Sequence, residues 1–264
     1  MPDFLQQIVA HKRQEIAEFT AKLPLAELQP AALARRDYRG FAAALSAPHR
    51  VHIIAEIKRA SPSKGDIRIG LDPVALALAY AAGGASAISV LTERAFFKGS
   101  PEDLAAVRAA TSLPVLRKDF ILSPYQVYES AAMGADAILL IVRILADDEL
   151  KALYWLARDL GLDVLVEIHN EAEAMRANRL GARLVGINNR DLAHFDTDVE
   201  RARRVAVTLN PDTTVVAASG IDGVAAIHNT VAAGVTRFLV GEALVRAPDP
   251  AALLRVLRAA GDLP

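Results

Sequence analysis

Short apolar segments alternate with longer amphipathic segments along most of the chain. From residue 51 onward, eight Val/Ile/Leu-rich runs are each followed by a stretch with helical periodicity. Continuous apolar runs of this kind are typical of parallel strands buried on both faces. Eight strand–helix units predict an α/β fold, a (β/α)8 TIM barrel. The runs are VHIIAEIK, ASAISVLT, PVLRKDF, ADAILLIVR, DVLVEIHN, RLVGINNR, TTVVAASG and TRFLVGE.

Glycines punctuate this pattern at regular places. Gly84, Gly134, Gly181 and Gly234 stand just before the second, fourth, sixth and eighth runs, where glycine commonly ends a helix. The alternative is a doubly wound open sheet. Such sheets often carry a GxGxxG motif after the first strand, and this chain has none there.

The first fifty residues have a different texture. They predict two amphipathic helices, roughly 3–20 and 24–46, with prolines as punctuation. We therefore expect one barrel domain over residues 1–264, with residues 1–48 as an N-terminal helical extension. The apolar face of the first helix carries Leu5, Ile8, Ile16 and Phe19.

Composition and charge narrow the function classes. Thirty basic residues against 31 acidic ones give a net charge of −1, which argues against nucleic acid or an anionic membrane as the main partner. The absence of cysteine excludes disulfides, thiolate metal sites and cysteine nucleophiles. The N-terminal segment lacks an apolar signal region, and no run of about 18 apolar residues occurs. We expect a cytoplasmic protein.

Charged and polar side chains close several of the apolar runs. In a barrel, alternate side chains face the interior, and the active site lies at the carboxyl ends of the strands. An uncompensated charge buried there costs several kcal/mol, so the residues are expected to share one cavity. The alternative is an ion-pair plug without chemistry. The residues are Glu56 and Lys58 on the first run, Lys118 on the third, Glu167 on the fifth, and Asn188 and Arg190 on the sixth.

Four other residues are expected to have supporting or structural roles. Asp119 has the opposite parity to Lys118, so it is expected to orient groups on the helix side. His169 lies near the rim, but no acid or nucleophile stands at an evident spacing from it. We therefore expect His169 to support a site residue and not to react with the substrate itself. His52 at the far end of the first run and Trp155 within a helical pattern are expected to be structural.

The last two runs end in AASGI and LVGEA, which predicts an anion site. Barrels often bind phosphate through backbone N–H groups after strands seven and eight. Ser219, Gly220 and Gly241 suit close approach of a phosphate, with Arg190 and Lys58 to balance its charge. No cluster has metal-ligand spacing and no nucleotide motif is present. The inventory therefore indicates acid–base chemistry on a small phosphorylated substrate, with no cofactor and no metal.

An ordered set of motifs resembles one enzyme family. IIAEIKRASPSKGDI, LTERAFFKGS, PVLRKDFI, ILLIVRIL, LVEIHNEAE, GINNRDL, SGI and VGEAL are similar to the signatures of the indole-3-glycerol-phosphate synthase family of tryptophan biosynthesis. The resemblance covers nearly the whole chain. It implies a carboxy-lyase that closes 1-(2-carboxyphenylamino)-1-deoxyribulose 5-phosphate to indole-3-glycerol phosphate, with loss of carbon dioxide and water.

The resemblance also implies roles for individual residues. Lys118 matches the general acid that protonates the ketose oxygen, and Glu167 matches the base that acts in dehydration. Lys58 corresponds to a lysine at the substrate carboxylate and a second acid, and Glu56 would orient both lysines. The remaining matches are Asn188 and Arg190 on the carboxylate and hydroxyls, Ser61 on a mobile lid, Phe97, Phe120, Leu140 and Leu192 around the aromatic ring, and Ser219, Gly220, Gly241 and the backbone of Glu242 at the phosphate.

Rival functions remain open from the residues alone. A lysine at a strand end, such as Lys118, is also the imine former of Schiff-base aldolases. A phosphate-ligand-binding barrel without catalysis is the non-enzyme alternative. Phosphoribosylanthranilate isomerase shares the fold but uses a cysteine base, which this chain lacks. We expect a monomer or weak homo-oligomer, and which glutamate is the base in dehydration stays open.

Overall fold

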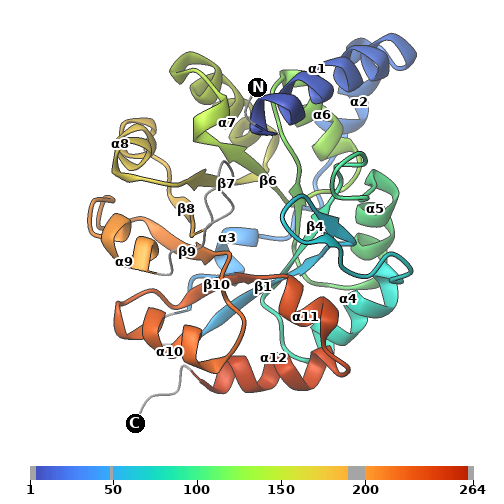
Figure 1. The fold of residues 1–264 in the computed structure, drawn as a ribbon. Coiled ribbons are helices and arrows are strands. Elements are labelled where there is room, and N and C mark those ends of the chain that lie inside the picture. The colour runs from blue at the N-terminus through green and yellow to red at the C-terminus, as the bar shows by residue number, and fades with distance from the viewer. Residues whose placement is uncertain (1–3, 48–49, 190–199, 261–264) are drawn as a thin grey trace.

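The computed structural model describes residues 4–47, 50–189 and 200–260. Eight parallel strands close into a barrel in the order β1-β10-β9-β8-β7-β6-β5-β4 (Figure 1). The predicted barrel is confirmed and the open sheet is excluded, because β1 pairs with both β4 and β10. The strands are β1 His52–Ile57, β4 Ala87–Leu91, β5 Val115–Lys118, β6 Ala137–Ile141, β7 Asp163–Ile168, β8 Leu184–Asn188, β9 Thr214–Ala218 and β10 Arg237–Val240.

Helices surround the barrel, one after each strand. The four glycines predicted at helix ends all have positive φ. Two short elements were not predicted, the 3-10 turn η1 (Val142–Ile144) after β6 and α11 (Glu242–Arg246) after β10. The outer helices are α4 Pro73–Ala82, α5 Pro101–Ala110, α6 Pro124–Ala132, α7 Asp147–Leu160, α8 Glu171–Leu180, α9 Glu200–Ala206, α10 Val224–Ala232 and α12 Pro250–Ala259.

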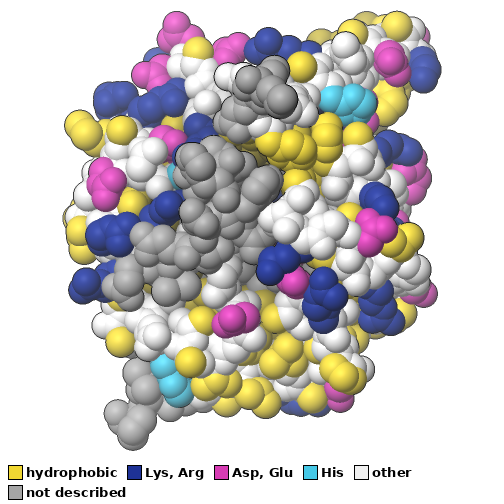
Figure 2. All heavy atoms as spheres, viewed as in Figure 1, with side chains coloured by type: hydrophobic (Ala, Val, Ile, Leu, Met, Phe, Trp, Pro, Cys, Tyr) yellow, Lys and Arg dark blue, Asp and Glu magenta, His cyan; other side chains and the backbone are white. Residues whose placement is uncertain are grey.

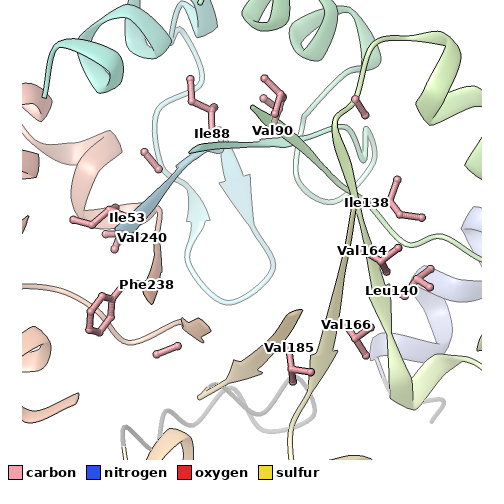
Figure 3. Close-up of a cluster of buried hydrophobic side chains, with 14 of the residues drawn as sticks. Ile53, Ile88, Val90, Ile138, Leu140, Val164, Val166, Val185, Phe238 and Val240 are labelled. Carbon is pink, nitrogen blue, oxygen red and sulfur yellow. The ribbon is translucent and has the colours of Figure 1, made fainter. Parts of the chain in front are cut away.

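Strand parity separates two hydrophobic layers. One set of side chains points outward to the helices, and Figure 3 labels several of them, including Ile53, Ile138 and Leu140. The alternate set, including Ile54 and Leu116, fills the barrel interior. Because successive side chains of a strand point to opposite faces, the polar residues that share the interior parity must emerge at the barrel mouth.

The N-terminal extension contacts both ends of the barrel. It consists of α1 (Phe4–Lys22), α2 (Leu25–Ala34) and α3 (Phe41–Ala44). Phe41 of α3 is fully buried in the interior layer, and Figure 1 shows this helix within the ring of strands. Leu5 and Ile8 of α1 belong to the same layer. The extension therefore closes the floor of the barrel and covers part of its mouth.

The predicted helix 24–46 is wrong in its middle. Pro30 lies inside α2, and the chain leaves the helix at Arg35, whose backbone is extended. Tertiary contacts hold this break. The Arg35 guanidinium and the Arg39 backbone N–H both bind Asp136 Oδ1, at 2.9 and 3.0 Å. The Arg39 guanidinium also donates to the carbonyls after α5, at 2.6 and 2.9 Å.

Across the described ranges, none of the helices is long and apolar enough to cross a bilayer.

Candidate active site

A cavity of about 570 Å³ opens at the carboxyl ends of the strands. Its lining combines charged residues, a loop after β1, an apolar wall and the loops after β9 and β10. Twelve of the residues predicted to form the site line this one cavity. They are Glu56, Lys58, Ser61, Phe97, Lys118, Phe120, Glu167, Asn188, Ser219, Gly220, Gly241 and Glu242.

Glu56 joins the two lysines. Its Oε1 accepts a hydrogen bond from Lys58 Nζ at 2.6 Å, and its Oε2 lies 3.4 Å from Lys118 Nζ. Behind it, the buried Tyr80 hydroxyl donates to the backbone oxygen of Glu56 at 3.0 Å. The side chains of Lys58 and Lys118 are 16% and 19% exposed, whereas that of Glu56 is 3% exposed. Both lysines therefore reach the cavity, while the carboxylate that holds them is buried behind it.

This arrangement fixes the charge states. Burial raises the pKa of Glu56, but the charges of Lys58 and Lys118 prevail and lower that pKa to about 2. Burial lowers the pKa of Lys118, but the charges of Glu56 and Glu167 prevail and hold it above 10.5. At neutral pH Lys118 is therefore protonated beside an ionised Glu56.

Glu167 lies on the other side of Lys118, on β7. Its Oε1 accepts a hydrogen bond from Asn188 Nδ2 of β8 at 3.2 Å. The same oxygen lies 3.6 Å from Nε2 of His169, whose side chain is 1% exposed. His169 thus stands behind Glu167 and away from the cavity lining, as the sequence indicated. A proton donor and a proton acceptor face the same space, which suits acid–base chemistry.

An apolar wall lines the cavity beside these charges. The rings of Phe97 and Phe120 lie 6.1 Å apart, centroid to centroid. Glu93 holds this wall, because its carboxylate accepts hydrogen bonds from the backbone N–H groups of Phe96 and Phe97 at 2.7 and 2.9 Å. Figure 2 shows hydrophobic side chains gathered beside α1 on this end of the barrel. Other wall residues are Phe4, Leu5, Ile8, Leu91, Leu139, Ile141 and Leu239.

The SPSKG loop forms a small hairpin at the cavity. It consists of β2 (Ala60–Ser61) and β3 (Gly65–Asp66), which pair antiparallel. Lys98 Nζ binds Asp66 at 2.6 Å, and Arg59 binds Asp103, so the hairpin is tied to the loop after β4 and to α5. The Ser61 hydroxyl is buried and has no hydrogen-bond partner among the described residues.

The loops after β9 and β10 border the opposite end of the cavity. Ser219 and Gly220 line this end of the cavity, and their consecutive positive φ values of 68° and 76° mark a tight turn after β9. Asn189 fixes this turn, since its Nδ2 donates to the Ser219 carbonyl at 3.1 Å. The Glu242 carboxylate accepts a hydrogen bond from Arg246 at 3.1 Å. The assignment of the Glu242 backbone to the anion end stays a prediction.

One predicted residue is not brought into the cavity, and two others cannot be placed relative to it. Leu140 is fully buried on the outer face of β6, packed toward the helices (Figure 3), and this corrects its assignment to the ring-binding slot. Its neighbours Leu139 and Ile141 have the interior parity and line the cavity instead. Arg190 and Leu192 lie outside the described residues.

Several functional positions were missed by the sequence reasoning. Leu5 and Ile8 were predicted only as part of an amphipathic face, and Phe4 was not singled out. Such a face indicates burial but not the surface that covers it. Lys12 of α1 binds Asp119 at 2.9 Å, and both side chains are almost fully buried. No sequence signal connects these two residues. Asp119 also accepts a hydrogen bond from Thr92 at 2.6 Å, in agreement with its predicted orienting role.

Gly241→Ala is expected to lower kcat by about 10- to 100-fold, because small displacements of catalytic groups have effects of that size. A Cβ at residue 241 would lie 2.5 Å from Glu56 Oε1, so the carboxylate must move and its hold on the lysines weakens. Gly223→Ala is the matched control, since a Cβ there meets no atom within 4 Å. Equal kcat in the two variants, measured by steady-state kinetics, would contradict this role.

No group of three His, Cys, Asp or Glu side chains in the described part of the chain could hold a metal ion. That no metal or cofactor takes part stays a prediction.

Comparisons with known proteins give a consistent result. A family model described as indole-3-glycerol phosphate synthase matches residues 5–257. A protein of that name from Desulfosudis oleivorans is 53% identical over 97% of this chain and 99% of its own length. One from Acidithiobacillus ferrooxidans is 48% identical with the same coverage. A solved thiamine phosphate pyrophosphorylase from Pyrococcus furiosus shares the fold alone, with a TM-score of 0.62, 19% identity, and coverage of 81% of this chain and 96% of its own.

Proposed function

This chain belongs to the indole-3-glycerol phosphate synthase family, and from that premise we propose how its cavity carries out the reaction. The chain is a decarboxylating lyase of tryptophan biosynthesis. It closes 1-(2-carboxyphenylamino)-1-deoxyribulose 5-phosphate to indole-3-glycerol phosphate, with release of carbon dioxide and water. The observation that supports the following roles is the meeting of Lys118, Lys58, Glu56 and Glu167 in one cavity with an apolar wall and an anion end.

Lys118 is the general acid in ring closure. As the ring carbon that bears the carboxylate attacks the ketose carbon, a C–C bond forms and the carbonyl oxygen takes a proton from Lys118. Glu56 and Glu167 keep the lysine protonated at neutral pH, because their charges raise its pKa despite its burial. Loss of carbon dioxide then returns an electron pair to the ring.

Glu167 is the base in dehydration. It removes the proton that must leave as the new hydroxyl departs as water, and the indole double bond forms. Asn188 holds the accepting carboxylate by a hydrogen bond at 3.2 Å. Lys58 stands at the substrate carboxylate and supplies a second acid for the departing hydroxyl, held there by Glu56 at 2.6 Å.

The two ends of the cavity bring the reacting atoms together. Backbone N–H groups at residues 219–220 and 241–242 bind the phosphate, and the wall of Phe97 and Phe120 binds the aromatic ring. With both ends fixed, the ring carbon is held near the ketose carbon, which converts binding energy into orientation. Arg190 and Leu192 keep their proposed roles at the substrate hydroxyls and the ring.

The direct test is turnover of the named substrate. The purified chain is incubated with the carboxyphenylamino ribulose phosphate, and indole fluorescence is followed with no metal or nucleotide added. We expect fluorescence to rise in proportion to enzyme and carbon dioxide to be released in equal amount. Substrate binding without either product would support the non-catalytic barrel instead.

Lys12→Met is expected to raise KM about tenfold, the equivalent of about 1.4 kcal/mol of lost binding. Burial lowers the pKa of Lys12, but Asp119 and Glu15 raise it by more, so the lysine is charged. Its pair with Asp119 ties α1 to the residue that follows β5. Loss of that pair loosens Phe4 and Ile8, which line the cavity. Arg13→Met, exposed on the same helix, is the control. An unchanged KM for Lys12→Met would show that α1 does not depend on this pair.

Cellular setting and domain organisation are also part of the proposal. The substrate carries phosphate and carboxylate charges, which a bilayer excludes. A cytoplasmic location fits such a substrate. The packing of the extension against both ends of the barrel supports function as a single domain.

A further inference from the structure

One buried titratable side chain beside the site has no role in the mechanism above. His169 follows β7 directly and is 3% exposed. Its ring lies between two carboxylates, Glu167 on the cavity side and Glu173 of α8 on the helix side. A histidine between two acids is an arrangement that can hold and move a proton.

The helix-side contact determines which ring nitrogen carries hydrogen. Glu173 Oε2 accepts a hydrogen bond from the His169 backbone N–H at 2.8 Å and lies 3.2 Å from Nδ1. Burial raises the pKa of Glu173, but the hydrogen bond and charge of His169 and the charge of Arg143 lower it below its usual value. An ionised carboxylate can only accept hydrogen bonds. Nδ1 therefore carries the proton.

The cavity-side contact is unsatisfied without a further proton. Nε2 of His169 lies 3.6 Å from Glu167 Oε1, and it has no hydrogen-bond partner among the described residues. With Nδ1 protonated, a neutral ring presents a lone pair to a carboxylate oxygen, and two acceptors then face each other. One proton between them satisfies both. Hydrogen bonds of catalytic groups commonly tighten when the substrate is bound.

We propose that His169, oriented by Glu173, is a positioning residue that receives the proton Glu167 collects from the substrate and later returns it. This inference rests on the proposed role of Glu167 as base. The O–H bond of Glu167 breaks as the N–H bond at Nε2 forms, so Glu167 becomes a carboxylate again and the ring becomes an imidazolium. Glu173 and Glu167 then flank the cation. The ring becomes neutral again when the proton returns to Glu167, which releases it to water in the cavity.

Charged groups around the ring are consistent with this transfer. Arg143 of η1 binds the far oxygen of Glu173 at 3.2 Å, which keeps that carboxylate ionised and in place. Asn170 Nδ2 also donates to Glu173 Oε1, at 3.2 Å.

The test uses His169→Asn, whose amide reaches toward Glu173 as Nδ1 does but offers no titratable group to Glu167. We expect kcat to fall about tenfold, KM to change less than about twofold, and the acidic limb of the kcat–pH profile to move to higher pH. The limb moves because a proton bound by Glu167 can no longer be passed to the ring. A wild-type limb together with wild-type kcat would overturn the proposal.

His52→Asn is the matched control. His52 is also buried, but at the other end of the barrel, where it binds Ser86 and the Ala47 carbonyl at 3.0 and 2.9 Å. We expect it to lower Tm and leave the kcat–pH profile unchanged. A limb that moves equally in both variants would show a general structural effect and refute the role of His169.

A measurement on the wild-type chain keeps the proposal testable if His169→Asn does not fold. Nitrogen-15 NMR of the imidazoles should show His169 with Nδ1 protonated throughout and Nε2 exchanging its proton. A ring protonated only on Nε2 would refute the inference. If Glu167→Gln keeps full activity, the proposed base itself fails; if Glu167→Gln is inactive and His169→Asn is not, only the present inference fails.

Discussion

Lys118→Ala lowers kcat for indole formation by at least about 100-fold, the usual effect of removing a positioned acid. The variant loses the proton donor for the ketose oxygen, and ring closure precedes every later step. The fold is expected to remain, because Glu56 keeps its 2.6 Å pair with Lys58 and is not left as an isolated buried charge. Single-turnover assays should show neither carbon dioxide nor indole.

The pH dependence of the wild-type enzyme follows from the same residue. The pKa of Lys118 lies above 10.5, so its acid function and its contribution to stability are present below that pH. Both are lost as pH rises through the raised pKa. The contribution of Glu56 to stability depends on pH in the opposite direction. It is present above pH 4.5 and is lost as pH falls toward 2.

Lys151→Ala is the control for Lys118→Ala, since Lys151 is exposed on α7 and remote from the cavity lining. Near-wild-type turnover of Lys118→Ala would refute the acid role. A stable adduct on Lys118 after borohydride treatment with substrate would instead support imine chemistry of the aldolase type.

Glu167→Gln should reduce indole formation by at least about 100-fold and leave the earlier steps less affected. Glutamine has nearly the same shape and can still bond to Asn188, but it cannot accept the proton that leaves in dehydration. Carbon dioxide release should therefore exceed indole formation in a single turnover. The hydroxylated intermediate should be detectable by mass spectrometry.

Two comparisons make this prediction specific. Glu27→Gln, exposed on α2, should behave as wild type. Glu56→Gln should slow carbon dioxide release as well, because it weakens the hold on both lysines. If Glu56→Gln, and not Glu167→Gln, separates carbon dioxide release from indole formation, then Glu56 is the base in dehydration.

The barrel and most of the charged cluster could be predicted because strand geometry has a fixed period of two. Once VHIIAEIK is a strand, Glu56 and Lys58 must share a face, and the same argument places Lys118 and Glu167. β6 contains no polar residue that could indicate which of its side chains face the barrel interior. Leu140 was therefore assigned from motif resemblance alone, and the structure places Leu139 and Ile141 at the cavity instead.

Contacts between distant segments could not be predicted from local pattern. The alanine-rich stretch 24–46 has continuous helical character, and its break at Arg35 is stabilised by Asp136, about a hundred positions later. The Lys12–Asp119 pair likewise joins segments whose sequences show only a helix and a strand end. Amphipathicity reveals that α1 is covered on one side, but the covering surface is a tertiary property.

Residue 241 links two halves of the cavity that differ in purpose. The missing side chain leaves space for the Glu56 carboxylate, while the backbone of the same residue borders the anion end. A protein engineer who alters this position to admit a substrate without phosphate would also disturb the proton donors. Leu139 and Ile141 of the apolar wall offer no freer route, because Ile141 pairs in register with Glu167 and the register from Arg117–Ile138 continues to Lys118 and Leu139.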